Sequence, residues 1–188
     1  MTTNPALLEP ASMNEQAPDT FGVQFATTKG NFSVQVTKAW APLGADRFYN
    51  LVKHGFFAEA AFFRVVPGFI IQFGLSADPA VNRVWRAANI KDDPVRQSNK
   101  PGYITFATAG PNTRTTQLFI NFGNNTFLDS QGFAPFGKVT SGMDVVQRLH
   151  SGYGERPDQG SITSQGKAYL DKHFPNIDSI QSATIVSS

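Results

Sequence analysis

Seventeen of the 188 residues are phenylalanine, and so many large rings leave few options for the fold. The rings must fill a core or line an apolar groove, because each carries a large apolar area. The chain has no cysteine, so disulfides, thiolate zinc sites, iron–sulfur clusters and cysteine nucleophiles are excluded. At this length we expect one domain, held together by packing alone.

Charge and hydropathy exclude several classes of partner. No apolar run approaches the ~20 residues of a membrane helix, so we expect a soluble chain with no membrane partner. The net charge is +2 and no stripe of Lys and Arg is visible. Single-strand binders interleave basic and stacking residues along a groove, so no nucleic-acid partner is expected either.

The start of the chain divides into a leader and a hairpin. Residues 1–20 contain three prolines and no apolar periodicity, which predicts a flexible Pro/Ala-rich leader or a strap ahead of a domain at 21–188. Apolar residues alternate with polar or small ones over 21–25 and again over 32–36, and a turn sequence lies at 28–31. This pattern predicts two antiparallel strands.

The rest of the chain reads mainly as strands. The apolar run 61–73 is broken by a Pro-Gly turn and predicts two buried strands, whereas the polar segment 75–102 predicts a long surface loop. Further strands are expected at 103–107, 117–121, 136–140 and 180–186, and helices from Pro42 to Gly55, after a Ser141 cap, and between 164 and 174. Strands without βαβ alternation predict a mainly β fold, an antiparallel sheet curled into a barrel or sandwich with two or three helices outside.

Three familiar motifs appear only in fragments. Residues 132–138 match the first seven positions of a phosphate-binding loop, but Val139 stands where a Mg²⁺-binding Ser or Thr is required. Residues 152–154 begin a dinucleotide fingerprint, but Pro157 occupies the position of its third glycine. The three histidines lack the spacing of a zinc hydrolase. We therefore expect neither a cofactor nor a metal.

Three polar side chains interrupt apolar strands. Arg64, Gln72 and Gln117 lie within or beside runs of Phe, Ile, Leu and Val. A buried arginine must reach solvent, meet a carboxylate or face a site, and no acidic residue lies close to Arg64 in the sequence. Two interpretations are open. In the first, the three residues are unrelated and each is bonded to nearby backbone. In the second, they act together and describe an apolar pocket edged by one guanidinium and two amides.

Three sets of motifs match one known family in order and spacing: FFRVVPGFIIQFG at 62–74, FATAGPN at 106–112 with TQLFIN at 116–121, and FLD at 127–129 with FGKV at 136–139. They resemble the cyclophilin-type peptidyl-prolyl cis-trans isomerases over residues 21–149. The loop around 92–94 and the tail from 157 look like those of a bacterial-type branch.

The resemblance implies an eight-stranded antiparallel barrel capped by helices, and an enzyme that accelerates rotation about X–Pro bonds to assist protein folding. It implies that Arg64 is the catalytic arginine and Gln72 the amide that orients it. The implied partners are proline-containing peptides and unfolded proteins, bound by a monomer. The implied substrate-binding residues are Phe69, Ile70, Phe119, Leu128 and Phe133 around the proline ring, Ala107, Thr108 and Gln117 along the peptide backbone, and Phe127.

Departures from the family pattern leave alternatives open. Thr108 stands where many members have Asn, and Phe133 stands in place of a common His. Either change could produce a catalytically weak proline-peptide-binding module or a chaperone. Phe127 replaces the Trp of members that bind cyclosporin tightly, so weak cyclosporin binding is expected.

Two further expectations concern Arg64 and the compartment. Catalysis by Arg64 requires its side chain to project into an apolar cleft with no carboxylate neighbour to neutralise it.

The leader resembles the segment that follows a removed signal in exported members. We therefore expect a cytoplasmic protein if Met1 is the native start, and a periplasmic or secreted one if a signal peptide has been trimmed.

Overall fold

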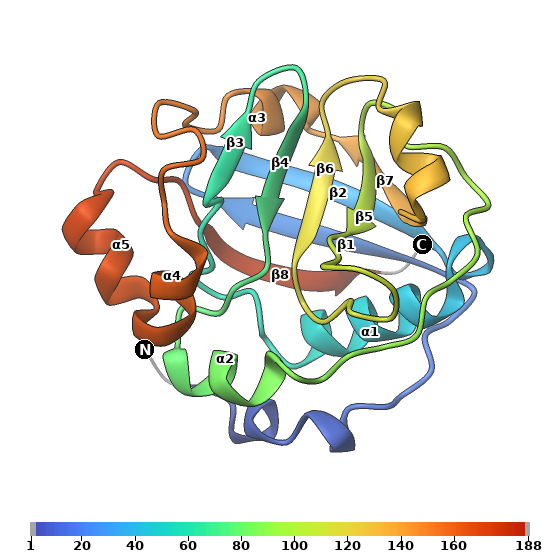
Figure 1. Ribbon diagram of the computed structural model, residues 1–188, viewed down its shortest axis with the longest axis horizontal. Helices are drawn as coiled ribbons and strands as arrows, with labels where there is room; N and C mark the ends of the chain where they lie inside the picture. Colours follow the sequence, from blue (N-terminus) through green and yellow to red (C-terminus); the bar gives the residue numbers. More distant parts are fainter. Residues whose placement is uncertain (1–2, 187–188) are drawn as a thin grey trace.

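The computed structural model describes residues 3–186 and contains one eight-stranded antiparallel sheet (Figure 1). The strands are β1 Thr20–Thr27, β2 Gly30–Thr37, β3 Arg64–Val66, β4 Ile70–Phe73, β5 Tyr103–Phe106, β6 Leu118–Asn121, β7 Pro135–Ser141 and β8 Ile180–Val186, in the spatial order β3-β4-β6-β5-β7-β2-β1-β8. Every strand expected from the sequence is present, within a few residues of its predicted bounds.

The sheet curls until its two edge strands approach each other. Ala61 and Ser179, just ahead of β3 and β8, form an isolated antiparallel bridge. The Phe62 N–H donates to the Asp178 carbonyl at 2.9 Å, and the Ile180 N–H donates to the Ala60 carbonyl at 2.8 Å. The barrel is therefore closed by irregular backbone bonds between the two edges.

The interior of the barrel is aromatic. Alternation in β1 and β2 places Phe25 opposite Phe32, and their rings stack with centroids 4.8 Å apart. Phe48, on helix α1 (Pro42–Lys53), packs its ring 6.3 Å from Phe25 and 5.1 Å from Phe136. Helix α1 follows its predicted span and covers the core with its apolar face, so most of the Phe residues fill the core, as their number predicts.

The segment 75–102 is not a surface loop throughout, and that prediction is wrong in part. Helix α2, Pro79–Trp85, begins after an Asp78 side chain that accepts a hydrogen bond from the Ala80 N–H. Val81 and Trp85 are buried on one face of this helix. A seven-residue helix has two turns, so two apolar residues four apart are its whole periodic signal.

The C-terminal helices also differ from the prediction. Helix α3, Met143–Gln147, is capped by Gly142 rather than by Ser141. The helix expected between 164 and 174 is α5, Lys167–His173, and a further helix that was not expected, α4 Gln159–Gln165, precedes it. Gly166 separates them with φ +65°, where a Cβ would lie 2.2 Å from the Ala77 carbonyl oxygen. The described residues thus form five α-helices instead of two or three, and none of the five could cross a membrane.

The N-terminal segment follows the second of its two alternatives, the strap. Its described part contains two 3₁₀ turns, η1 Pro5–Leu8 and η2 Pro10–Ser12, and runs beneath α1 and α2 in Figure 1. Leu7 is buried, and its carbonyl accepts a hydrogen bond from the Trp85 indole at 2.7 Å. The Ala17 N–H donates to the Asp46 carboxylate at 2.8 Å. The described part of this segment is thus bonded to both helices, at Leu7 and at Ala17.

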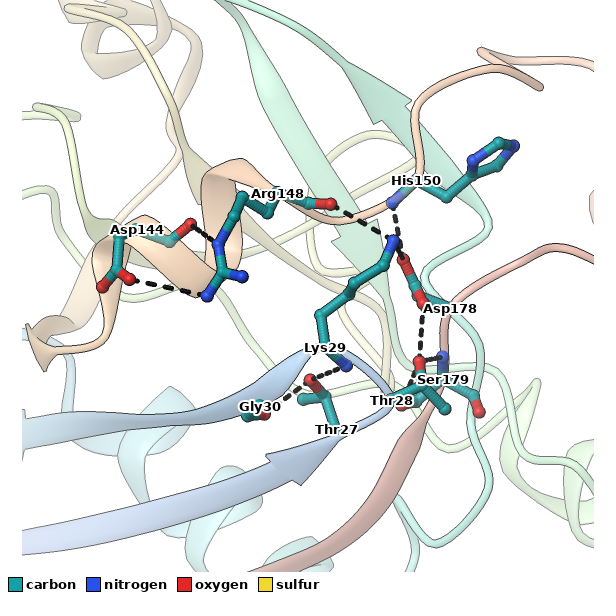
Figure 2. Close-up of polar contacts among 9 residues, drawn as sticks. All are labelled: Thr27, Thr28, Lys29, Gly30, Asp144, Arg148, His150, Asp178 and Ser179. Carbon is teal, nitrogen blue, oxygen red and sulfur yellow. Dashed lines mark hydrogen bonds and ion pairs between the residues drawn. The ribbon is translucent and has the colours of Figure 1, made fainter.

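One buried carboxylate joins three segments that are far apart in the sequence (Figure 2). Asp178, ahead of β8, accepts hydrogen bonds from the Thr28 hydroxyl at 2.7 Å, from Lys29 Nζ at 3.0 Å and from the His150 N–H at 2.7 Å. Burial alone would raise the pKa of Asp178, but these hydrogen bonds outweigh it, and the pKa lies below its ordinary value. This carboxylate fixes the start of the chain segment that follows α3.

Candidate functional site

A pocket of about 620 Å³ opens beside β3, β4 and β6. Every site residue predicted from the sequence lines it except Phe127. The pocket also includes residues that the sequence did not identify: Arg86, Asn89, Ala109, Thr113, Thr115 and Gln159. Arg86 follows α2 and Gln159 begins α4, so both belong to elements that were missed or misplaced.

The three polar residues of the apolar strands form one chain of hydrogen bonds. Arg64 and Gln72 are paired across β3 and β4, and Arg64 Nη1 donates to Gln72 Oε1 at 3.1 Å. Gln72 Nε2 in turn donates to Gln117 Oε1 at 2.8 Å. The view that these residues are unrelated is therefore wrong. The strand register aligns an amide ladder that holds the guanidinium at the pocket.

A carboxylate contacts this arginine, contrary to expectation. Arg64 Nε donates to Glu155 Oε2 at 2.9 Å, although the two residues are 91 positions apart. The Glu155 side chain is 61% exposed and that of Arg64 is 26% exposed. Exposed ion pairs contribute little because water screens them, and Glu155 bonds only the Nε side, so the terminal nitrogens of the guanidinium can still donate. Arg64 Nη2 makes no hydrogen bond to any residue between 3 and 186.

The apolar wall of the pocket is a small cluster separate from the main core. Ile70, Phe119 and Leu128 are buried in it, with Phe69, Ala107 and Phe133 packed against them. The rings of Phe119 and Phe133 meet edge to face with centroids 5.7 Å apart. Such a cluster, open on one side, offers a dry surface for a compact apolar ring.

Phe127 lies at the rim instead of in the wall. Its side chain is 54% exposed, and its ring stacks on Phe69 with centroids 6.1 Å apart. Phe69 also lies beneath the Arg64 guanidinium at 5.8 Å. Phe127 thus contacts the site through Phe69.

Residues 15–167 match the family model described as cyclophilin type peptidyl-prolyl cis-trans isomerase/CLD. The chain belongs to this family. Curated relatives agree with the match. A peptidyl-prolyl cis-trans isomerase of Acinetobacter baylyi is 35% identical over 133 residues, which are 68% of this chain and 70% of the relative. Peptidyl-prolyl cis-trans isomerase-like 1 of Emericella nidulans is 30% identical over 130 residues, 68% of this chain and 80% of that protein.

Solved cyclophilins share the fold. The crystal structure of a cyclophilin type isomerase of Cryptosporidium parvum aligns with a TM-score of 0.66 and 21% identity, over 90% of this chain and 99% of the other. A second structure of that protein, obtained in the presence of the dipeptide Ala-Pro, aligns with the same TM-score and 20% identity, over 89% and 99% of the two chains. The eight-stranded antiparallel architecture expected from the sequence is therefore that of the cyclophilin family.

In this cyclophilin, a buried polar network supports the apolar wall from behind. The carboxylate of Asp129, in the 3₁₀ helix η4 (Thr126–Gln131), accepts hydrogen bonds from the Ser98 hydroxyl and from the Asn99 N–H and amide group. The Asn99 amide also donates to the Phe133 carbonyl at 3.0 Å. Asp129 thereby ties together the two wall residues that flank it, Leu128 and Phe133.

Replacing Asp129 by alanine is expected to lower stability by about 1–3 kcal/mol and to raise KM for proline peptides, because the wall loses its support. Burial tends to raise the pKa of Asp129, but the Ser98 and Asn99 hydrogen bonds outweigh it and lower the pKa. The pKa of this carboxyl is lower in the folded state than in the unfolded state, where it is about 4. Its ionised form therefore stabilises the fold at pH values above about 4, and that stabilisation is lost as the pH falls through the lowered folded-state pKa.

Chemical denaturation at several pH values measures this effect. The stability difference between wild type and Asp129→Ala should be constant above about pH 5 and shrink below about pH 4. Asp171→Ala is the control. Among residues 3–186 this exposed carboxylate pairs only with Lys167, so its loss should change neither stability nor KM appreciably. A difference that grows on acidification would contradict this role.

Proposed function

We propose that this cyclophilin accelerates cis-trans isomerisation of X–Pro peptide bonds, with Arg64 as its catalytic residue. Rotation about an X–Pro bond crosses a barrier of about 20 kcal/mol because twisting destroys the amide resonance. In the twisted state the proline nitrogen is pyramidal, and its localised lone pair accepts a hydrogen bond that neither planar isomer can accept. A donor aimed at this nitrogen stabilises the transition state preferentially, which is the condition for catalysis.

Different residues of the pocket have different roles in this catalysis. The apolar wall holds the proline ring still and excludes water. The amides of Gln72 and Gln117 hold the arginine in place. Ala107 and Thr108, which line the same pocket, hold the peptide backbone. No covalent bond forms or breaks, so the site needs no nucleophile.

One observation carries the proposal: a guanidinium, fixed by an amide ladder, lies beside an apolar cluster within one pocket. A protease-coupled assay with a proline tetrapeptide tests it. We expect the chain to accelerate the conversion of cis to trans peptide. Binding of the peptide without acceleration would favour the peptide-binding module. Suppression of aggregation without acceleration would favour a chaperone.

We further propose that the enzyme acts as a monomer and binds cyclosporin weakly. Phe127 carries no N–H donor, whereas the Trp that it replaces has one. A single hydrogen bond contributes about 0.5–1.5 kcal/mol, so Phe127→Trp should strengthen inhibition about two- to tenfold. Inhibition titrations of the two forms measure this. Wild-type inhibition as strong as that of Phe127→Trp would contradict the proposal.

A further inference from the structure

We propose that Glu155 is a positioning residue for Arg64, which rests on the proposed function. Its carboxylate holds the Nε side of the guanidinium, so that the unpaired Nη2 faces the bound X–Pro bond. Glu155 does not line the pocket and bonds Nε, not a terminal nitrogen, so it leaves the space for the peptide open. Because Glu155 bonds Nε from outside the pocket, it can position the arginine without competing with the substrate for the terminal nitrogens.

Two anchors act on different nitrogens of one planar group. Glu155 accepts from Nε at 2.9 Å, and Gln72 accepts from Nη1 at 3.1 Å. A planar guanidinium held at two nitrogens can neither turn about the Cδ–Nε bond nor move with the rest of its side chain without losing a hydrogen bond. With only one of these two hydrogen bonds, the Arg64 side chain keeps a rotational freedom that it would have to lose when it binds the transition state. The second anchor therefore prepares the donor before the peptide binds.

The loop that carries Glu155 is tightly bonded within itself. In the segment 151–156, the Gly154 N–H donates to the Ser151 carbonyl at 3.0 Å, and the Arg156 N–H donates to the Tyr153 carbonyl at 3.0 Å. These consecutive turns give the backbone of Glu155 a defined position next to Arg64, although its side chain is exposed.

The same loop is fastened to the barrel. At its start, the His150 N–H donates to Asp178, the carboxylate that joins three segments in Figure 2. The Tyr153 ring packs edge to face against His150 and Phe174, at centroid distances of 4.8 and 4.9 Å. The Val65 N–H, next to Arg64 on β3, donates to the Gly154 carbonyl at 3.4 Å. The loop and the strand of the arginine thus form one unit, which suits a supporting residue.

Glu155→Gln tests the inference, since it keeps the side-chain shape and removes the charge. Exposed pairs contribute modestly, so we expect kcat to fall about two- to fivefold with KM unchanged. A merely structural loss would lower the melting temperature or raise KM instead. Asp144→Asn is the matched control: its carboxylate pairs with Arg148 on the surface, and both partners are more than half exposed. This variant should leave kcat unchanged.

A double-mutant cycle with Arg64→Ala separates this inference from the proposed function. Glu155→Gln should have no further effect once Arg64 is gone, because it acts only through that side chain. Unchanged or raised activity in Glu155→Gln, or an equal loss in the Arg64→Ala background, would overturn the positioning role. If Arg64→Ala itself retains full activity, the proposed function of Arg64 fails and Glu155 has nothing to position.

Discussion

Replacing Arg64 by alanine is expected to lower kcat/KM for a proline tetrapeptide by at least about tenfold while the fold stays intact. Each tenfold change in rate requires about 1.4 kcal/mol of transition-state stabilisation, and removal of one preorganised donor from a catalytic site costs about 10²- to 10³-fold. We set the minimum loss at about tenfold, below that range, because Arg64 is partly exposed and paired with Glu155. The protease-coupled assay measures the change.

The control for this variant is another arginine. Arg83 lies on α2, is exposed and does not line the pocket, so Arg83→Ala should leave the rate unchanged. Circular dichroism and thermal melting check that both variants are folded. Unchanged turnover in folded Arg64→Ala would remove this arginine from the mechanism.

Phe73→Ala is expected to have the largest effect on stability, a loss of about 3–5 kcal/mol. Phe73 ends β4 and is fully buried, and its ring contacts those of Phe25, Phe57 and Phe62 at 5.8, 5.7 and 5.4 Å. Alanine would leave a cavity among rings that belong to separate segments and cannot all shift to fill it. For a chain of this length the melting temperature should fall by roughly 6–20 °C.

The matched control makes the same substitution on the surface. Phe127 is 54% exposed and has one ring partner within the described range 3–186, so Phe127→Ala should cost less than about 1 kcal/mol of stability. Denaturant unfolding of both variants measures the difference. Equal losses would show that ring contacts within the barrel do not determine its stability.

Much of the fold could be predicted because strands bury alternate residues. The alternation over 21–25 and 32–36 fixes both the hairpin and its inward rings. The same period-two rule places Arg64 and Gln72 within apolar strands, where their polarity marks a site. Motif resemblance then adds the other predicted site residues. All of them line the pocket except Phe127, which reaches it through Phe69.

The features that were missed depend on short elements or on contacts between distant residues. Helix α2 contains only two turns, so its amphipathic signal is weak, and Arg86 beyond its end was missed with it. The ion pair between Arg64 and Glu155 joins positions 91 apart, and no local pattern encodes such a pairing. The choice between a leader and a strap likewise depends on tertiary contacts, such as the one between Leu7 and Trp85.

The central claim is that Arg64 binds the twisted peptide bond more strongly than either planar isomer. Exchange NMR on a saturating proline peptide tests it directly, because it yields both the interconversion rate on the enzyme and the dissociation constant. In Arg64→Ala we predict that the on-enzyme rate falls at least about tenfold while Kd changes less than about threefold. An unchanged on-enzyme rate together with a much weaker Kd would contradict the claim.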